Sequence, residues 1–287
     1  MREINKEEIE QFIPLDKSWV IRMGILDLTI NPEKYSKDIK NFLDSQTDLG
    51  GDLKALKMVA EKWDTDEHLD VGESGTIYRF VKFYNWLNEI KHDPIISGTL
   101  VERSKNSMTN NPDIINWPPE KVLELDHKTS QWATMQYLLE SKEKRRKVAN
   151  PPYKLKVTYE AVEHWESQRA KGQVWVARKD VTFLNQAMAF TNGLKTGGIK
   201  FEGEQAEDFC FENALGLISI EEGRQKYPSV EGHEVPRFEE MERVVALADK
   251  EGVIDSKDHR VVQAMVMRQI FLKRPYTVKD PDAVNKT

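Results

Sequence analysis

The sequence predicts an α/β or α+β fold divided into two lobes. Three observations lead to this prediction. Segments of helical periodicity alternate with short runs rich in β-branched residues, a pattern that indicates a mixed fold. The chain has 287 residues, enough for two modest domains. Its mean hydropathy of −0.62, with 39 % apolar and 31 % charged residues, indicates several small layers rather than one thick core.

Five segments predict helices. Residues 76–90 place Ile77, Phe80, Val81, Tyr84 and Leu87 on one face, and a turn at Gly75-Thr76 opens the segment. The same periodicity is present at 131–140, 181–191, 238–251 and 259–271. Gly252 is expected to end the helix at 238–251 as a C-terminal cap.

Five short segments predict strands. They are 95–96 with its flanks, 154–159, 173–177, 198–201 and 275–279. The run KVLELD at 121–126 is also strand-like. Residues 104–120 carry Asn, Pro and Ser and predict an irregular crossing, and the basic run at 141–152 ends in two prolines, as a solvated connection would.

Charge and cysteine content exclude several classes of protein. The net charge of −6 argues against a nucleic-acid partner, which requires a basic surface. The single cysteine, Cys210, excludes an intrachain disulfide framework and a thiolate metal cage, and its apolar surroundings predict a buried, inert thiol. No run approaches about 18 apolar residues, so neither a membrane partner nor a membrane span is expected. We expect a cytoplasmic protein.

Two motifs could bind an anion at the start of a helix. Lys17-Ser18-x-x-x-Arg22 places a hydroxyl and two cations where free N–H groups and the helix dipole attract negative charge. In the segment from Gly72 to Arg79, two glycines allow the backbone to approach a ligand closely. The alternative for the first is a capping serine with solvated cations, and for the second a plain strand–turn–helix junction.

Three further motifs carry polar groups at turns or helix starts. Thr129-Ser130-Gln131 offers two hydroxyls and an amide that suit a phosphate or a polyol, although capping alone would explain them. Asn150-Pro151-Pro152-Tyr153 could fix a tyrosine hydroxyl at a rigid corner or be only a turn. Asp258-His259-Arg260, followed by Asp280-Pro281 and Lys286-Thr287, is by itself commonly a capped helix with surface charges.

Taken in order along the chain, these motifs resemble those of the enolpyruvyl transferases, and of the EPSP synthase (3-phosphoshikimate 1-carboxyvinyltransferase) family in particular. The C-terminal run SKDHRVVQAMVMRQIFLKRPYTVKDPDAVNKT contributes most to the resemblance. The resemblance implies two lobes, 17–179 and 1–16 with 180–287, built from β-α-β-α-β-β units around an interdomain cleft. It implies transfer of the enolpyruvyl group of phosphoenolpyruvate to a hydroxyl of shikimate 3-phosphate, by addition and elimination, without a metal or organic cofactor.

The resemblance also implies a role for individual residues. Lys17 would contact both substrates and assist proton transfer, and Asp208 would accept the proton of the attacking hydroxyl. Phosphoenolpyruvate would be held by the Gly75-Thr76 turn with Arg103, Arg260 and Lys286. The phosphorylated alcohol would be held by Ser18, Arg22, Thr129, Ser130, Gln131 and Tyr153. Arginine suits this work because its planar fork binds carboxylates and phosphates through two hydrogen bonds.

The chain departs from the family pattern in three ways. It is shorter, and Glu73 replaces an Asn beside the proposed phosphoenolpyruvate site. The Lys-Glu-Thr-x-Arg motif that supplies an acid–base Glu is not recognisable, and Glu234 and Arg237 in HEVPRFEEMER are possible substitutes. These departures keep open an alternative function that is not enzymatic, in which the chain is a non-catalytic paralogue that binds a ligand or a protein.

Overall fold

The chain folds into two compact units with a predominantly helical architecture. The structure, a computed structural model, describes residues 15–46, 49–63, 65, 67–91, 93–105, 110–125, 129–140, 151–169, 171–173, 176–180, 206–230, 236–280 and 283. Helices hold 67 % of these residues, and the strands named among them are two short parallel ones. Unit 1 comprises Met1–Asp16 with Arg178–Thr287, and unit 2 is Lys17–Ala177.

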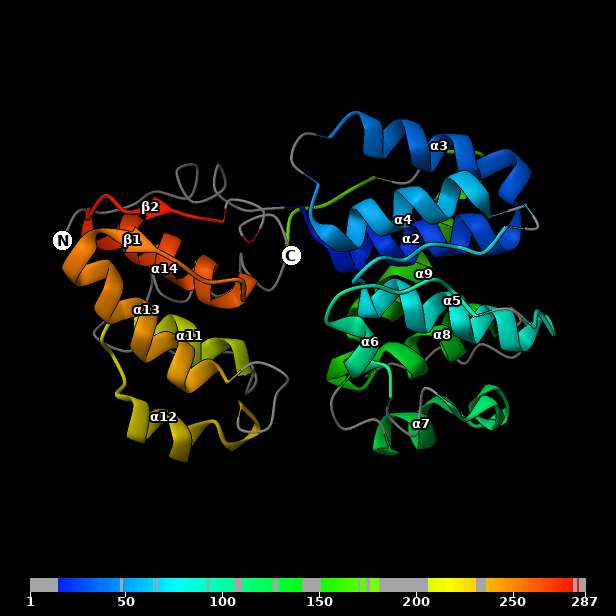
Figure 1. Ribbon diagram of the computed structural model, residues 1–287. Coiled ribbons are helices and arrows are strands. Elements are labelled where there is room, and N and C mark those ends of the chain that lie inside the picture. Colours follow the sequence, from blue (N-terminus) through cyan, green and yellow to red (C-terminus); the bar gives the residue numbers. More distant parts are fainter. Residues whose placement is uncertain are drawn as a thin grey trace. The chain divides into compact units, whose positions relative to one another are not determined.

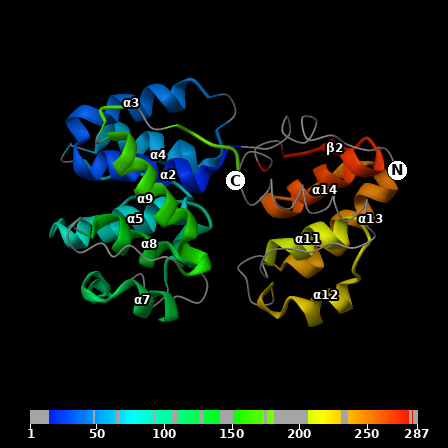
Figure 2. The ribbon, with the colours of Figure 1, turned by 180° about the vertical axis from the view of Figure 1, so that it is seen from behind.

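Unit 2 is a stack of helices. Its elements are α2 (Lys17–Ile30), α3 (Pro32–Asp44), α4 (Gly51–Lys62), α5 (Gly75–Leu87), α6 (Leu100–Arg103), η2 (Pro112–Asn116), α7 (Pro119–Leu125), α8 (Gln131–Leu139), η3 (Tyr153–Leu155) and α9 (Lys156–Arg169). Figures 1 and 2 show the stack running from α3 through α2 and α4 to α5, α8 and α7. Helix α2 contacts α3, α4, α8 and α9, so this helix is central to the unit.

Helix α2 is buried along most of its length because apolar residues surround it. Val20, Ile21, Met23 and Leu26 have no exposed surface, and burial of this kind is the main favourable contribution to folding. The fully buried Asp27 carboxylate is paired with α9: Arg169 donates to it through Nη2 at 2.5 Å, and the Trp165 indole donates to it at 2.7 Å. A buried charge requires such partners, so this contact fixes α9 against α2.

Unit 1 contains four named α-helices, one short 3-10 helix and two strands among its described residues. They are α11 (Ala206–Ala214), α12 (Ile220–Lys226), η4 (Pro228–Val230), α13 (Arg237–Glu251), β1 (Val253–Ile254), α14 (His259–Leu272) and β2 (Thr277–Val278). Helix α11 packs on α13 and α14 around a core that includes Phe209, Phe238 and Met265. The strands are parallel, with Val253 opposite Thr277. Cys210 is fully buried, as predicted.

The two segments that connect the units are paired with each other. Within unit 1, Leu15 forms an antiparallel bridge with Lys179, and the Asp16 amide donates to the Arg178 carbonyl at 2.9 Å. Within unit 2, the Trp19 indole donates to the Val176 carbonyl at 3.0 Å. The expected lobe was 17–179, and the unit is 17–177.

Four of the five predicted helices are present, and α5, α8, α13 and α14 begin and end within a few residues of the prediction. Gly252 ends α13 in the left-handed conformation at φ 68°, and it caps the helix as expected. The fifth, at 181–191, lies outside the described residues, as do the predicted strand at 198–201 and most of the connection at 141–152. Residues 104–120 include η2 and the start of α7 rather than irregular structure alone.

Two strand predictions are wrong. Residues 154–159 form the end of η3 and the start of α9, and residues 121–125 belong to α7. In the short window 154–159 the apolar residues alternate, which mimics a strand. The longer sequence buries Thr158, Ala161, Val162 and Trp165, and this is the spacing of a helix face.

The other strand predictions are met in part. β2 lies within the predicted 275–279. Ile95 pairs in parallel with Asp70, as an isolated bridge rather than a longer strand. The described residues of the segment 173–177 carry no named strand. Along the described parts of the chain, no helix is long and apolar enough to cross a membrane.

Candidate functional site

Three of the predicted motifs begin helices of unit 2. Lys17 is the first residue of α2, Gly75 the first of α5 and Gln131 the first of α8. The first turn of a helix leaves backbone N–H groups without helical partners, and the helix dipole adds positive potential there. Ser74 caps α5 by accepting from the Ile77 amide, whereas the Ser130 side chain makes no capping hydrogen bond to α8.

Two guanidinium groups approach the start of α5 at Gly75. A Cβ at this position would lie 2.9 Å from Nη1 of Arg79 and 3.6 Å from Nη1 of Arg103. A side chain at this position would therefore require the end of the Arg79 side chain to shift. Arg79 is 5 % exposed, and Arg103 donates through Nη2 to the Glu73 carbonyl at 3.1 Å. Two like charges at a helix start form a local environment that favours an anion.

Gln131 connects this turn to α8. Its side-chain oxygen accepts from Arg79 at 2.6 Å, and its side-chain nitrogen donates to the Thr76 hydroxyl at 2.8 Å. Its backbone amide donates to the Thr129 hydroxyl at 3.3 Å. The second and third motifs of the sequence, about fifty residues apart, are thus joined through side-chain hydrogen bonds.

Lys17 joins the same cluster through Asp52 of α4. Lys17 Nζ lies 2.9 Å from Oδ2 of Asp52, and the Ser74 hydroxyl donates to Oδ1 at 2.5 Å. Burial would raise the pKa of Asp52, but Lys17, the Ser74 hydroxyl and Arg103 outweigh burial and hold that pKa below its ordinary value. Asp52 is therefore ionised at neutral pH. Its negative charge offsets part of the positive charge of Lys17, Arg79 and Arg103.

We call the group formed by Lys17, Asp52, Ser74, Gly75, Thr76, Arg79, Arg103, Thr129 and Gln131 the Gly75 cluster. The sequence prediction includes six of these residues: Lys17, Gly75, Thr76, Arg103, Thr129 and Gln131. Arg79 belongs to the predicted motif. Its position one helical turn after Gly75 could have indicated that it also contributes to the site. Asp52 carries no signal in the sequence, because its contact comes from a different helix.

Arg22 and Ser18 have a different environment. The Arg22 guanidinium is 7 % exposed and donates to the Thr158 and Thr134 hydroxyls at 2.7 and 3.3 Å and to the Ser18 carbonyl at 2.8 Å. These contacts join α2, α8 and α9 inside the unit. A buried charge held by three oxygen atoms stabilises the packing of these helices.

The remaining predicted residues belong to unit 1 or have undescribed side chains. Arg260, near the start of α14, lies 3.7 Å from Asp180 and donates to Gln263 at 3.1 Å. Asp208 is in the first turn of α11 and is 3 % exposed. Tyr153 is in η3, but its side chain is outside the description. Glu234 and Lys286 lie outside the described residues.

The described parts of the chain contain no group of three or more His, Cys, Asp or Glu residues arranged to hold a metal ion. Comparisons of the chain with protein-family models, with curated proteins and with solved structures gave no match.

Proposed function

We propose that the Gly75 cluster binds phosphoenolpyruvate or a similar phosphorylated carboxylate, and that the chain transfers the enolpyruvyl group to a hydroxyl of a phosphorylated alcohol such as shikimate 3-phosphate. The observation that carries the binding step is that both Arg79 and Arg103 lie within 4 Å of the position a Cβ would take at Gly75. Guanidinium groups bind phosphate and carboxylate oxygens in pairs, and the start of α5 adds backbone donors. The reaction itself rests on the resemblance of the motifs.

In this proposal the basic residues and the acidic residues have different roles. Arg103 and Arg79 hold the anionic groups of phosphoenolpyruvate, and Gln131 and Thr76 supply neutral hydrogen bonds beside them. The ion pair with Asp52 holds Lys17 next to the Ser74 turn, because Asp52 also accepts from the Ser74 hydroxyl. From this position Lys17 assists proton transfer. Asp208, Arg260, Glu234, Tyr153 and Lys286 keep the roles that the resemblance gives them. The family's two-lobe fold of β-α-β-α-β-β units is likewise part of the proposal.

Binding is tested by titrating phosphoenolpyruvate into the full chain, with calorimetry as the readout. Arg103→Gln should weaken binding by roughly tenfold or more, because a charge-assisted hydrogen bond contributes about 1.5–3 kcal/mol. Lys105→Gln is the matched control, since Lys105 is an exposed cation two residues away that pairs with Glu102. Equal affinity in both variants, or no binding to the wild type, would contradict the proposed site.

Catalysis is tested by inorganic phosphate release from phosphoenolpyruvate, with shikimate 3-phosphate and a panel of other alcohols. Asp208→Asn should lower turnover by at least about 10²-fold, the contribution typical of a general base, and leave phosphoenolpyruvate affinity unchanged. Lys17→Met should reduce both turnover and affinity. Unchanged turnover in Asp208→Asn would remove this residue from the mechanism.

Glu73 offers a further test of the same site. Its carboxylate lies against Gly98, and its carbonyl accepts from Arg103. Glu73→Asn removes a negative charge close to the anion site, so phosphoenolpyruvate should bind more tightly. If calorimetry shows the same affinity for the variant and the wild type, the phosphate does not bind beside residue 73.

A non-catalytic ligand-binding module is the second candidate function. The helical architecture favours it, because the described residues contain two short strands rather than repeated β-α-β-α-β-β units. This candidate predicts phosphoenolpyruvate binding that depends on Arg103, with no phosphate release for any alcohol of the panel. The two assays together therefore separate the candidates.

A further inference from the structure

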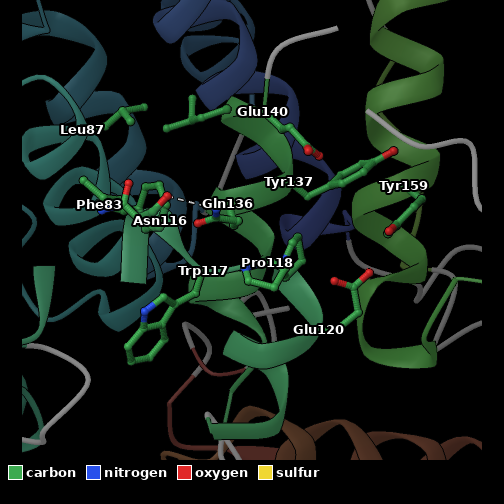
Figure 3. Close-up of a pocket in the computed structure, with 13 residues that line it drawn as sticks. Phe83, Leu87, Asn116, Trp117, Pro118, Glu120, Gln136, Tyr137, Glu140 and Tyr159 are labelled. Carbon is green, nitrogen blue, oxygen red and sulfur yellow. Dashed lines mark hydrogen bonds between the residues drawn. The ribbon is translucent and has the colours of Figure 1, made fainter. Parts of the chain in front are cut away.

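Unit 2 contains a pocket of about 570 Å³ that shares no residue with the Gly75 cluster (Figure 3). Its walls come from the end of α5, the turn at residues 115–118, the start of α7, the C-terminal half of α8 and α9. Its volume is within the range of sites that bind small molecules. The lining residues therefore indicate which class of small molecule the pocket suits.

Three polar side chains of the wall are available to a ligand. The Asn116 amide, the Glu120 carboxylate and the Tyr159 hydroxyl have no hydrogen-bond or ion-pair partner among the described residues. Asn116 and Glu120 are exposed, and Tyr159 is 9 % exposed. An ionised carboxylate only accepts hydrogen bonds, whereas a hydroxyl and an amide both donate and accept. A ligand that satisfies all three groups must therefore both donate and accept.

These three groups are spread across the pocket rather than gathered at one point. Figure 3 shows Asn116 and Glu120 on opposite sides of Gln136. Gln136 donates through Nε2 to the Ile115 carbonyl at 3.0 Å, and this contact fixes the turn that carries Asn116. Tyr159 belongs to the side of Glu120, whose charge acts on its hydroxyl. A ligand that reaches all three groups needs polar atoms at several separate positions.

The charges of the wall favour a neutral ligand. Burial raises the pKa of the Tyr159 hydroxyl, and the charges of Glu120 and Glu140 raise this pKa further. The described lining residues include no Lys, Arg or His, so an anion would meet negative charge without a cationic partner. Glu140 already has an interaction partner, and solvent screens the exposed Glu120 carboxylate. The wall therefore provides no strong site for a cation either.

Apolar side chains form much of the remaining wall. Phe83, Leu87 and Leu139 line the pocket, and Leu87 is 45 % exposed. Lys121 lies over the Trp117 ring, 4.1 Å from its centroid, so a ligand can use only the other face of that ring. Apolar and aromatic surfaces pack against C–H groups. A pyranose ring combines such C–H faces with hydroxyl groups around its edge.

We propose that this pocket binds a neutral saccharide of one or two rings. Sugar hydroxyls donate to Glu120 and exchange hydrogen bonds with Asn116 and Tyr159, and a C–H face of the ring lies against the apolar wall at Leu87. This inference is independent of the proposed function, because the two sites share no residue and a neutral sugar does not compete with phosphoenolpyruvate for cations.

The test measures binding of neutral sugars to the full chain by saturation-transfer difference NMR. The probes are the methyl glycosides of glucose, galactose and mannose, with maltose and cellobiose, and at least one should bind. Tetrahydropyran, the same six-membered ring without hydroxyls, should bind at least about tenfold more weakly than that sugar, because it cannot donate hydrogen bonds. No saturation transfer to any sugar at about 20 mM, or equal affinity for tetrahydropyran, would overturn the proposal.

Glu120 gives the proposal a test by charge. The uronate analogue of the tightest-binding methyl glycoside carries a carboxylate at C6 and should bind about threefold more weakly or worse, because Glu120 repels it. Glu120→Gln should lower affinity for the neutral sugar about fivefold, since a charge-assisted hydrogen bond is about twice as strong as a neutral one, and should not lower affinity for the uronate. Glu124→Gln, an equal charge change at an exposed position of the same helix, is the control and should leave both affinities unchanged.

Tyr159→Phe locates the site on α9. It removes the hydroxyl and keeps the ring that stacks on Tyr137, so sugar affinity should fall about fivefold, as for loss of one hydrogen bond. Tyr35→Phe removes a hydroxyl from α3, outside the pocket, and should bind sugar like the wild type. Sugar binding that neither Tyr159→Phe nor Glu120→Gln weakens would place the sugar elsewhere and overturn the proposal. Phosphoenolpyruvate affinity should stay at its wild-type value in these variants, so the two proposals can fail separately.

Discussion

Gly75 is the residue on which the geometry of the anion site depends most. Gly75→Ala would place a methyl group 2.9 Å from the Arg79 guanidinium, and Arg79 must move away to accommodate it. We expect phosphoenolpyruvate affinity measured by calorimetry to fall by roughly tenfold, as for loss of one charge-assisted hydrogen bond. Stability should not rise, because Gly75 is the first residue of α5 rather than an interior position, and the displaced Arg79 weakens its hydrogen bond to Gln131.

Gly51→Ala provides the control for this substitution. Gly51 also begins a helix, α4, but within the described residues no atom beyond its chain neighbours and the backbone of its own helix lies within 4 Å of a Cβ built there. This variant should bind phosphoenolpyruvate like the wild type. Equal affinities in the two alanine variants would show that Arg79 does not contact the ligand.

Asp52 makes the stability of unit 2 depend on pH. Its pKa is lowered in the folded chain, since Lys17, Ser74 and Arg103 outweigh the effect of burial. A lowered pKa means that the carboxylate stabilises the folded state above its ordinary pKa of about 3.9 and that this contribution is lost as the pH falls through the folded pKa. Asp52→Asn should therefore be less stable than the wild type near pH 6.

The same difference should begin to shrink below about pH 4, where the Asp52 carboxylate of the unfolded chain takes up its proton, and it is lost as the pH falls through the lower pKa of the folded chain. Urea unfolding of both proteins between pH 3 and pH 7 measures it. A difference in unfolding free energy that stays constant over this range would mean that the Asp52 charge does not stabilise the unit.

At the scale of elements, one side chain joins two helices of unit 1. Asp258 caps α14 by accepting from the Arg260 amide at 2.9 Å, and it also accepts from Nε of Arg237 on α13 at 2.8 Å. Both side chains are nearly buried. Asp258→Ala should lower the unfolding free energy by about 3–5 kcal/mol, because it removes a cap and breaks a buried ion pair.

Urea denaturation measures this loss, and Asp255→Ala is the comparison. Asp255 pairs with Lys279 on the surface, where both side chains are about half exposed. Exposed pairs contribute little to stability, so this variant should resemble the wild type. Similar losses for both substitutions would refute the structural role given to Asp258.

The sequence predicted elements well where one pattern extends over many residues. The helices α5, α8, α13 and α14 have apolar faces that repeat over two or more turns. Gly75 marks the start of α5, and Gly252 marks the end of α13. The strand prediction at 154–159 failed because a window of six residues does not distinguish strand alternation from one face of a helix. The burial of Trp165 in the folded unit favours the helix.

At the scale of the whole molecule, the sequence predicted the local parts of the site but not all of its contacts. The motifs at 17–22, 72–79 and 129–131 each predicted a helix start, and the Gly75 cluster joins them through Gln131 and Asp52. Asp52 could not be found in the sequence, because its role depends on how α4 packs between α2 and α5. Such tertiary contacts leave no local pattern.

The paired segments at residues 15–16 and 178–179 tether both ends of unit 2. If unit 2 unfolds while unit 1 stays folded, its chain remains a closed loop of about 160 residues, and closure lowers the entropy of the unfolded state. By the relation used for covalent cross-links, this effect reaches at most about 5 kcal/mol. A fragment of residues 17–177 should therefore unfold at lower urea concentration than the same unit in the full chain. All seven Trp residues lie in this unit, so tryptophan fluorescence follows its unfolding in both proteins, and identical midpoints would mean that the tether opens before the unit unfolds.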